Sequence, residues 1–145
     1  MLPLGKKNTL KVLRSVDFGF YLDAEDYDSV LLPIRYAPKD LKEGDEIEVF
    51  IYLDSEDRII ATTEEPFAEV GEFAYLKVKD MSKFGAFLDW GLPKDLFVPY
   101  REQKMRMERN KSYWVYIYID QETDRIAATA KIDRYLDKYN PPYTE

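Results

Sequence analysis

One pattern of residues occurs twice in this chain, 66 positions apart and without a gap. The first copy, KVLRSVDFGFYLDAEDYDSVLLP, covers residues 11–33, and the second, KVKDMSKFGAFLDWGLPKDLFVP, covers residues 77–99. Both contain an FG pair, an LD pair and a closing proline at matching positions. Self-similarity at a fixed period fixes domain count and topology together. We therefore predict two small domains of one kind, at residues 1–66 and 67–145.

Short strands separated by turns account for most of each copy. EIEVFIYLD at 46–54 and YWVYIYID at 113–120 alternate apolar residues with period two, which predicts half-buried strands. A glycine between aromatic residues, as in FGFYLD and FGAFLD, indicates a bend or bulge where a strand curls. About five strands per copy predict an all-β protein: two tandem five-stranded antiparallel OB-fold barrels.

Two further local signals concern backbone turns and the C-terminal region. Gly44 and Asn110 precede the long strands, and both residue types tolerate a positive φ. Apolar residues at helical spacing within 132–139 predict a short C-terminal helix. The alternatives for it are an end piece packed on the second domain and a linker toward a part not included in the sequence.

The composition excludes several classes of chemistry. The chain has no cysteine and no histidine, so disulfides, thiolate chemistry, the usual zinc sites and imidazole-based triads are excluded. Acidic pairs at Asp54/Asp57 and Asp120/Asp124 lie in hairpin loops, where turn formation explains them. We expect no catalytic residue, metal or cofactor. Without a long apolar run or a secretory segment, we expect no membrane partner and a cytoplasmic location.

Charge is distributed unequally between the two copies. Residues 1–66 contain 8 basic and 15 acidic side chains, whereas residues 67–145 contain 13 of each. Nucleic-acid affinity comes largely from phosphate neutralisation, so the second copy is the more plausible one to contact nucleic acid.

The motifs GDEIEV at 44–49 and FGAFLD at 84–89 resemble those of the S1 RNA-binding domain. A longer stretch, from DSEDRIIATTEEP through VGEFAYLKVKDMSKFGAFLDWGLPKDLFVPYREQ, resembles the bacterial conserved virulence factor B family of RNA-binding regulators. The resemblance extends from Leu4 to about Tyr139. It implies a non-enzymatic regulator of virulence that binds single-stranded RNA. It also implies that a further S1 domain and a winged helix, typical of the family, are missing here.

The resemblance also implies which residues form the RNA face. In S1 domains these are the aromatics of the FGAF motif and of the following strand, on which bases stack. They correspond to Phe84, Phe87 and Phe97 in the second copy and to Phe18, Tyr21 and, less well, Leu31 in the first. Phosphates are expected to contact Lys77, Lys79 and a basic cluster, namely Arg101, Lys104, Arg106, Arg109 and Lys111.

Two features of this sequence differ from the family pattern. Pro33 and Pro99 occupy a position where many S1 domains have histidine, which removes a donor and a ring. The first copy has Leu31 in place of Phe97, surrounded by acidic residues at Glu25, Asp26 and Asp28. The second copy is therefore the expected main RNA contact.

Other interpretations of the same residues stay open. The aromatics can be core residues of small barrels, and the basic cluster can be a solvated surface. Because Trp90 lies beside a turn, we expect it to fix a loop and not to bind a ligand. An acidic first domain also fits a protein-interaction or scaffold module that does not bind RNA directly. The remaining outward aromatics suggest contact between domains or with missing parts: Phe50, Tyr52, Trp114, Tyr116 and Tyr118, together with Glu48.

Overall fold

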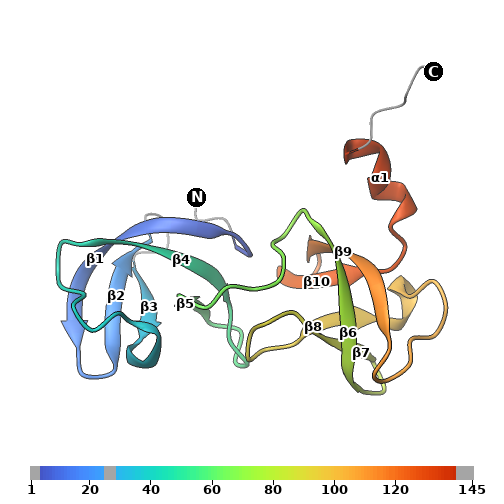
Figure 1. Cartoon of the computed structure of the whole chain (residues 1–145), viewed down its shortest axis with the longest axis horizontal. Coiled ribbons are helices and arrows are strands. Elements are labelled where there is room, and N and C mark those ends of the chain that lie inside the picture. Colours follow the sequence, from blue (N-terminus) through green and yellow to red (C-terminus); the bar gives the residue numbers. More distant parts are fainter. Residues whose placement is uncertain (1–3, 25–28, 140–145) are drawn as a thin grey trace. The chain divides into compact units, whose positions relative to one another are not determined.

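The computed structural model describes residues 4–24 and 29–139, with side chains described as far as residue 136. The chain divides into two compact units, Met1–Glu69 and Val70–Glu145. This boundary lies three residues beyond Pro66, where the sequence repeat predicts it. Each unit is described by itself below (Figure 1).

The first unit is a closed barrel of five strands in the order β1-β2-β3-β5-β4. A single turn of 3-10 helix, η2 (Ile34–Tyr36), follows β3. The predicted strands are all present: β1 (Lys7–Val16), β2 (Gly19–Asp23), β3 (Ser29–Pro33), β4 (Glu46–Leu53) and β5 (Ile59–Thr62).

The second unit repeats this topology as a closed barrel in the order β10-β8-β7-β6-β9. A 3-10 turn, η3 (Tyr100–Glu102), again follows the third strand, and a helix, α1 (Asp133–Tyr139), ends the described chain. The predicted fold class is confirmed. Its strands are β6 (Phe73–Met81), β7 (Gly85–Asp89), β8 (Leu96–Pro99), β9 (Ser112–Asp120) and β10 (Arg125–Thr129).

One strand pair in each barrel is parallel, so the description of the sheets as antiparallel throughout was incomplete. Leu31 pairs with Ile60 between β3 and β5, and Phe97 pairs with Ala127 between β8 and β10. The fifth strand returns antiparallel to the fourth. Closing the barrel then places it beside the third strand, which runs in the same direction.

The core of each barrel consists of the inward residues of the alternating strands. In β4 the side chains of Val49 and Ile51 are buried, as the period-two pattern predicted. Burying such branched side chains contributes about 1.5–3 kcal/mol each. The second core is built the same way, with Leu76, Val78, Leu88, Val98, Val115 and Ile117 buried.

The glycine of each FG pair allows two strands to approach closely. A Cβ on Gly85 would lie 2.3 Å from the Val98 carbonyl oxygen, and one on Gly19 would lie 2.2 Å from the Leu32 carbonyl oxygen. The bulge of each barrel lies in the neighbouring strand instead, between Val78 and Asp80 in β6. The glycines therefore mark the close approach of two strands and not the bulge.

The turn and helix predictions are confirmed. Gly44 has φ +91° and Asn110 has φ +71°. Helix α1 packs on the second barrel, because the Tyr135 ring stacks on the Tyr116 ring of β9 at 4.0 Å between centroids and an interplanar angle of 13°. The interpretation as a packed end piece is thus the one that the structure supports. None of the helices in the described residues has the length and apolar character needed to cross a membrane.

Candidate nucleic-acid interface

Three aromatic side chains lie on the outside of the second barrel around β7 and β8. Phe87 and Phe97 are directly opposite each other in the strand register, with ring centroids 5.2 Å apart and an interplanar angle of 40°. Both are half-buried, while Phe84, just before β7, is 66% exposed. The inward positions between them are taken by Ala86 and Leu88. The structure therefore brings Phe87 and Phe97 together and leaves Phe84 exposed just before the same strand. These three residues are called the platform below.

Gly85 makes room for one ring of the platform. A Cβ at this position would lie 3.0 Å from Cε1 of Phe97 and 2.8 Å from Cα of Pro99. Any side chain here would push the Phe97 ring away from the barrel wall. The glycine thus permits both the close approach of β7 to β8 and the position of the Phe97 ring.

The backbone that presents Phe84 is held by several hydrogen bonds. The Ser82 Oγ accepts from the Phe84 N–H at 3.1 Å, and the Phe84 carbonyl accepts from the Tyr100 N–H at 3.3 Å. The Tyr100 hydroxyl donates to the Ser82 carbonyl at 2.6 Å. Lys83 places its Nζ 5.2 Å from the Phe84 ring centroid, a contact the sequence analysis missed. An exposed ring on a fixed backbone beside a cation is suited to stacking on a base.

The first barrel presents a smaller group at the matching positions. Phe18 is 55% exposed and meets the half-buried Tyr21 edge-on at 6.2 Å. The Arg14 guanidinium lies 4.3 Å from the Tyr21 ring centroid, another contact that sequence reasoning missed. Leu31 stands opposite Tyr21. The acidic residues Glu25, Asp26 and Asp28 lie outside the described residues.

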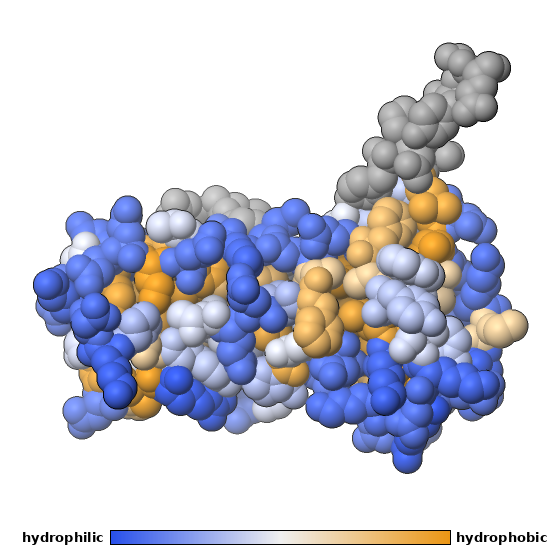
Figure 2. All heavy atoms as spheres, in the orientation of Figure 1, coloured by the Kyte–Doolittle hydropathy of each residue, from blue (hydrophilic) through white to orange (hydrophobic). Residues whose placement is uncertain are grey.

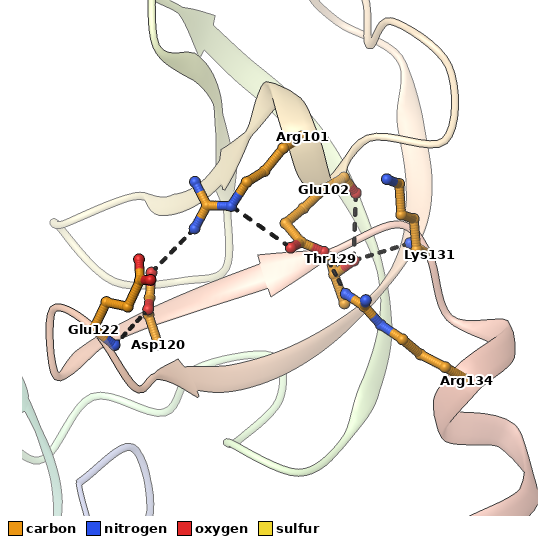
Figure 3. A network of polar contacts seen from close by, with 7 residues as sticks. All are labelled: Arg101, Glu102, Asp120, Glu122, Thr129, Lys131 and Arg134. Carbon is orange, nitrogen blue, oxygen red and sulfur yellow. Dashed lines mark hydrogen bonds and ion pairs between the residues drawn. The ribbon is translucent and has the colours of Figure 1, made fainter.

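The predicted phosphate contacts differ in how they are paired. Lys77 is exposed, and within the part of the chain whose side chains are described no acid forms an ion pair with it. Lys79 places its Nζ 3.5 Å from Oδ1 of Asp95. Arg101 lies 3.5 Å from Asp120 and 3.9 Å from Glu102, as Figure 3 shows. Of these three, Lys77 is the cation most available to a phosphate.

Most of the remaining basic cluster is also engaged within the second unit. Arg106 stacks on the Tyr100 ring at 4.6 Å. The exposed pairs contribute little to stability, but they reduce the positive charge offered to a ligand. These pairs are Lys104 with Asp133 at 3.5 Å, Arg109 with Asp80 at 2.7 Å and Lys111 with Glu108 at 3.2 Å.

The other aromatics singled out from the sequence separate into buried and exposed groups. Trp90 is buried and donates its indole N–H to the Lys94 carbonyl at 2.8 Å, so it fixes the loop before β8. Phe50, Tyr52 and Tyr116, expected on the outward strand faces, are also buried. The strand pattern alone did not reveal what covers them. Trp114 is 56% exposed.

Two tyrosines at matching positions have strongly perturbed acidity. Burial raises the pKa of Tyr52 to about 12, with Tyr36 and Glu64 acting in the same direction. Burial likewise raises the pKa of Tyr118 to about 12, reinforced by the carboxylates of Glu102 and Asp120. Both phenols therefore stay neutral at ordinary pH.

The acidic hairpin residues have a structural explanation in the first barrel. Asp54 accepts hydrogen bonds from the backbone N–H groups of Glu56 and Arg58, both at 2.9 Å, and from the Arg58 side chain. Burial alone would raise the pKa of Asp54, but these hydrogen bonds outweigh it and leave the pKa below its ordinary value. Across the described residues, no group of three or more acidic side chains is placed to hold a metal ion.

Comparison with known proteins gives consistent matches. A family model described as "S1 domain" matches residues 4–64 and again 70–131. An uncharacterised Bacillus subtilis protein, YitL, is 38% identical over 96 residues, which cover 65% of this chain and 32% of that protein. Conserved virulence factor B of Staphylococcus aureus is 30% identical over 100 residues, covering 69% of this chain and 30% of that protein. The predicted resemblance to this family is confirmed. The matched region is about a third of each relative's length.

A solved structure shares the fold over most of the chain. A multidomain protein with nucleic acid binding domains from Streptococcus pneumoniae matches with a TM-score of 0.74 and 20% identity, covering 93% of this chain and 48% of that one. At this level of identity the match shows the architecture alone.

Proposed function

Because the chain belongs to the S1 domain family, we propose that it binds single-stranded RNA, chiefly through the platform of the second barrel. In this proposal bases stack on Phe84, Phe87 and Phe97, while Lys77 and Lys83 neutralise phosphates. The match of the S1 domain model to both barrels supports nucleic acid as the class of ligand.

The exposure of the platform is the observation that carries the proposal. Adjacent apolar rings at the surface of a protein often mark an interaction site. The barrel already has a buried core, and Phe84 is 66% exposed outside it. Stacking each base contributes about 1–3 kcal/mol and requires no particular sequence.

Binding of a labelled single-stranded RNA at low and high salt tests the proposal. Affinity should fall as salt rises, because phosphate neutralisation releases counterions. Phe87→Ala combined with Phe97→Ala should weaken binding by about 1–3 kcal/mol for each stacked base lost. Phe87→Tyr with Phe97→Tyr keeps both rings and serves as the matched variant. Affinity that responds neither to salt nor to the alanine variant would overturn the proposal.

A second function, a scaffold that binds proteins without touching RNA, is favoured by one observation. Four cations of the basic cluster are paired with acids of their own unit, which lowers their value for phosphate binding. The acidic first barrel would then bind a basic partner. Retained binding of that partner in the presence of excess RNA would favour this function.

The role of the whole protein is part of the same proposal. The matched proteins are about three times longer than the region they share with this chain. We infer that the two barrels act as the RNA-contacting part of a non-enzymatic cytoplasmic regulator. A further S1 domain and a winged helix, expected from the family resemblance, would supply additional contacts.

A further inference from the structure

A second exposed aromatic pair lies on the outer face of β6 and β9, away from the platform. Tyr75 of β6 and Trp114 of β9 are directly opposite in the strand register, with ring centroids 5.5 Å apart. They are 60% and 56% exposed, among the largest exposed apolar side chains of the unit. On the face seen in Figure 2, hydrophilic side chains surround the hydrophobic ones that reach the surface.

The duplication shows that the barrel does not need these rings. At the matching register of the first barrel, Thr9 pairs with Glu48, and both are exposed. The same topology therefore closes with small or charged side chains here. The aromatic pair is specific to the second barrel and requires an explanation other than folding.

The strand register connects the pair to the platform through one lysine. Lys77 pairs with Ser112 of β9 on one side and with Asp89 of β7 on the other. Tyr75 lies two residues before Lys77 on the same strand face, a spacing of about 6.6 Å. On the other side, Asp89 lies two residues from Phe87 of the platform. Lys77 thus lies two residues from Tyr75 along β6, while Phe87 is on the neighbouring strand, two residues from the partner of Lys77.

The charges next to the lysine and the aromatic pair differ between the two barrels. In the first barrel the matching lysine, Lys11, lies opposite Glu46, and Glu48 occupies the position of Trp114. In the second barrel those two positions are Ser112 and Trp114. The second barrel therefore offers rings and an available cation where the first offers carboxylates, which repel phosphate.

From these observations we propose that the single-stranded RNA path continues from the platform past Lys77 onto Tyr75 and Trp114. This inference rests on the proposed function, since the platform supplies the first part of the path. A base stacks on the Tyr75–Trp114 pair, and Lys77 neutralises the phosphate between the two aromatic groups. The second barrel consequently binds longer strands more tightly than its platform alone allows.

Trp114 itself provides the readout for this path. The chain contains two tryptophans, and the other, Trp90, is 3% exposed inside its loop contact. Stacking of a base on Trp114 should quench its fluorescence. Titration of the full 145-residue chain with 4-nucleotide and 12-nucleotide oligouridylate, followed by both fluorescence quenching and anisotropy of a labelled strand, therefore reports on the pair directly.

A double substitution based on the first barrel tests the contribution to affinity. The double variant Tyr75→Thr with Trp114→Gln gives the second barrel the residue type of Thr9 and an uncharged analogue of Glu48. The first barrel already has this pair at the same register. We expect the 12-nucleotide strand to lose at least about fivefold in affinity, the lower end for one lost stack. Phe67→Ala, which removes an exposed ring elsewhere in the chain, is the matched control and should have little effect.

The outcomes separate this inference from the proposed function. Quenching of Trp114 with the same midpoint as the anisotropy change, together with the selective loss in the double variant, supports the path. Anisotropy binding without quenching, or with full affinity in the double variant, overturns the path and leaves the platform intact. Absence of anisotropy binding in the unmodified chain overturns both. Quenching by a protein partner without RNA binding would assign the pair to protein docking and would also overturn the path.

Discussion

The Phe97 ring lies against the space above Gly85, with its Cε1 3.0 Å from where a Cβ at Gly85 would stand. The glycine and the phenylalanine belong to neighbouring strands, β7 and β8, and are not opposite each other in the register. A residue without a side chain thus determines how an aromatic ring on the next strand is displayed.

Gly85→Ala should destabilise the second barrel by more than about 1 kcal/mol. The added Cβ would meet the Val98 carbonyl oxygen at 2.3 Å, and backbone atoms cannot move aside as a flexible side chain can. Urea unfolding measures the effect. Gly44→Ala is the control, because it also has a positive φ but no atom within 4 Å of the added Cβ. A loss for Gly85→Ala no larger than that of Gly44→Ala would contradict this explanation.

Lys77→Ala should reduce the salt dependence of RNA binding. Each phosphate contact on a single strand contributes a slope of about −0.7 to the plot of log affinity against log salt. Removing Lys77 should make the slope shallower by about that amount. Lys104→Ala is the comparison, since Lys104 is paired with Asp133, and its slope should match that of the unmodified chain. Equal slopes for all three proteins would exclude Lys77 as a phosphate contact.

Alkaline pH should destabilise both barrels through Tyr52 and Tyr118. Their pKa values near 12 in the folded chain exceed the ordinary value of 10.0, so folding favours the neutral phenol. The stabilisation is complete below pH 10 and is lost as the pH rises from 10 toward 12. Absorbance of tyrosinate during titration should show a late step near pH 12.

Substitution identifies the residues responsible for that step. Tyr52→Phe and Tyr118→Phe should each remove part of the late step. In denaturant every tyrosine should titrate near its ordinary value of about 10. A late step of unchanged size in the double variant would show that other tyrosines cause it.

Tyr135→Ala should destabilise the second barrel more than Arg134→Ala does. Tyr135 stacks on Tyr116, and such a pair contributes about 0.5–1.5 kcal/mol beyond area burial. Arg134 is about half exposed and forms an ion pair with the more buried Glu102 (Figure 3). Exposed ion pairs typically contribute about 0.2–1 kcal/mol. The Thr129 hydroxyl also donates a hydrogen bond to the Glu102 carboxylate at 2.8 Å. Thermal unfolding of the two variants ranks them, and the reverse order would mean that α1 is held mainly by charge.

The repeat and the strand periodicity were enough to predict the architecture. An offset of 66 residues with matching FG pairs implies two copies of one fold, and period-two alternation in 46–54 and 113–120 identifies the inward residues. These signals are local in the chain. Local sequence can also identify Gly44 and Asn110 as positions of positive φ.

The burial of particular aromatics could not be predicted in the same way. Phe50 and Tyr116 occupy outward positions of their strands, yet both are buried, and Tyr116 is covered by Tyr135 from a helix that follows the barrel. A strand pattern states which face a side chain is on and not what lies above that face. Lys83 and Arg14 were missed for the same reason, since their ring contacts depend on how loops and strands fold back.

The sequence by itself determined that this chain is a duplicated barrel, because repetition and alternation are properties of residue order. Tertiary structure decided which rings are exposed and which cations are available. Arg101, Lys104 and Arg109 form a basic run in the sequence, but each is paired with an acid distant along the chain. Exposure and ion pairing depend on residues brought together by chain closure, and a linear sequence does not specify those distances.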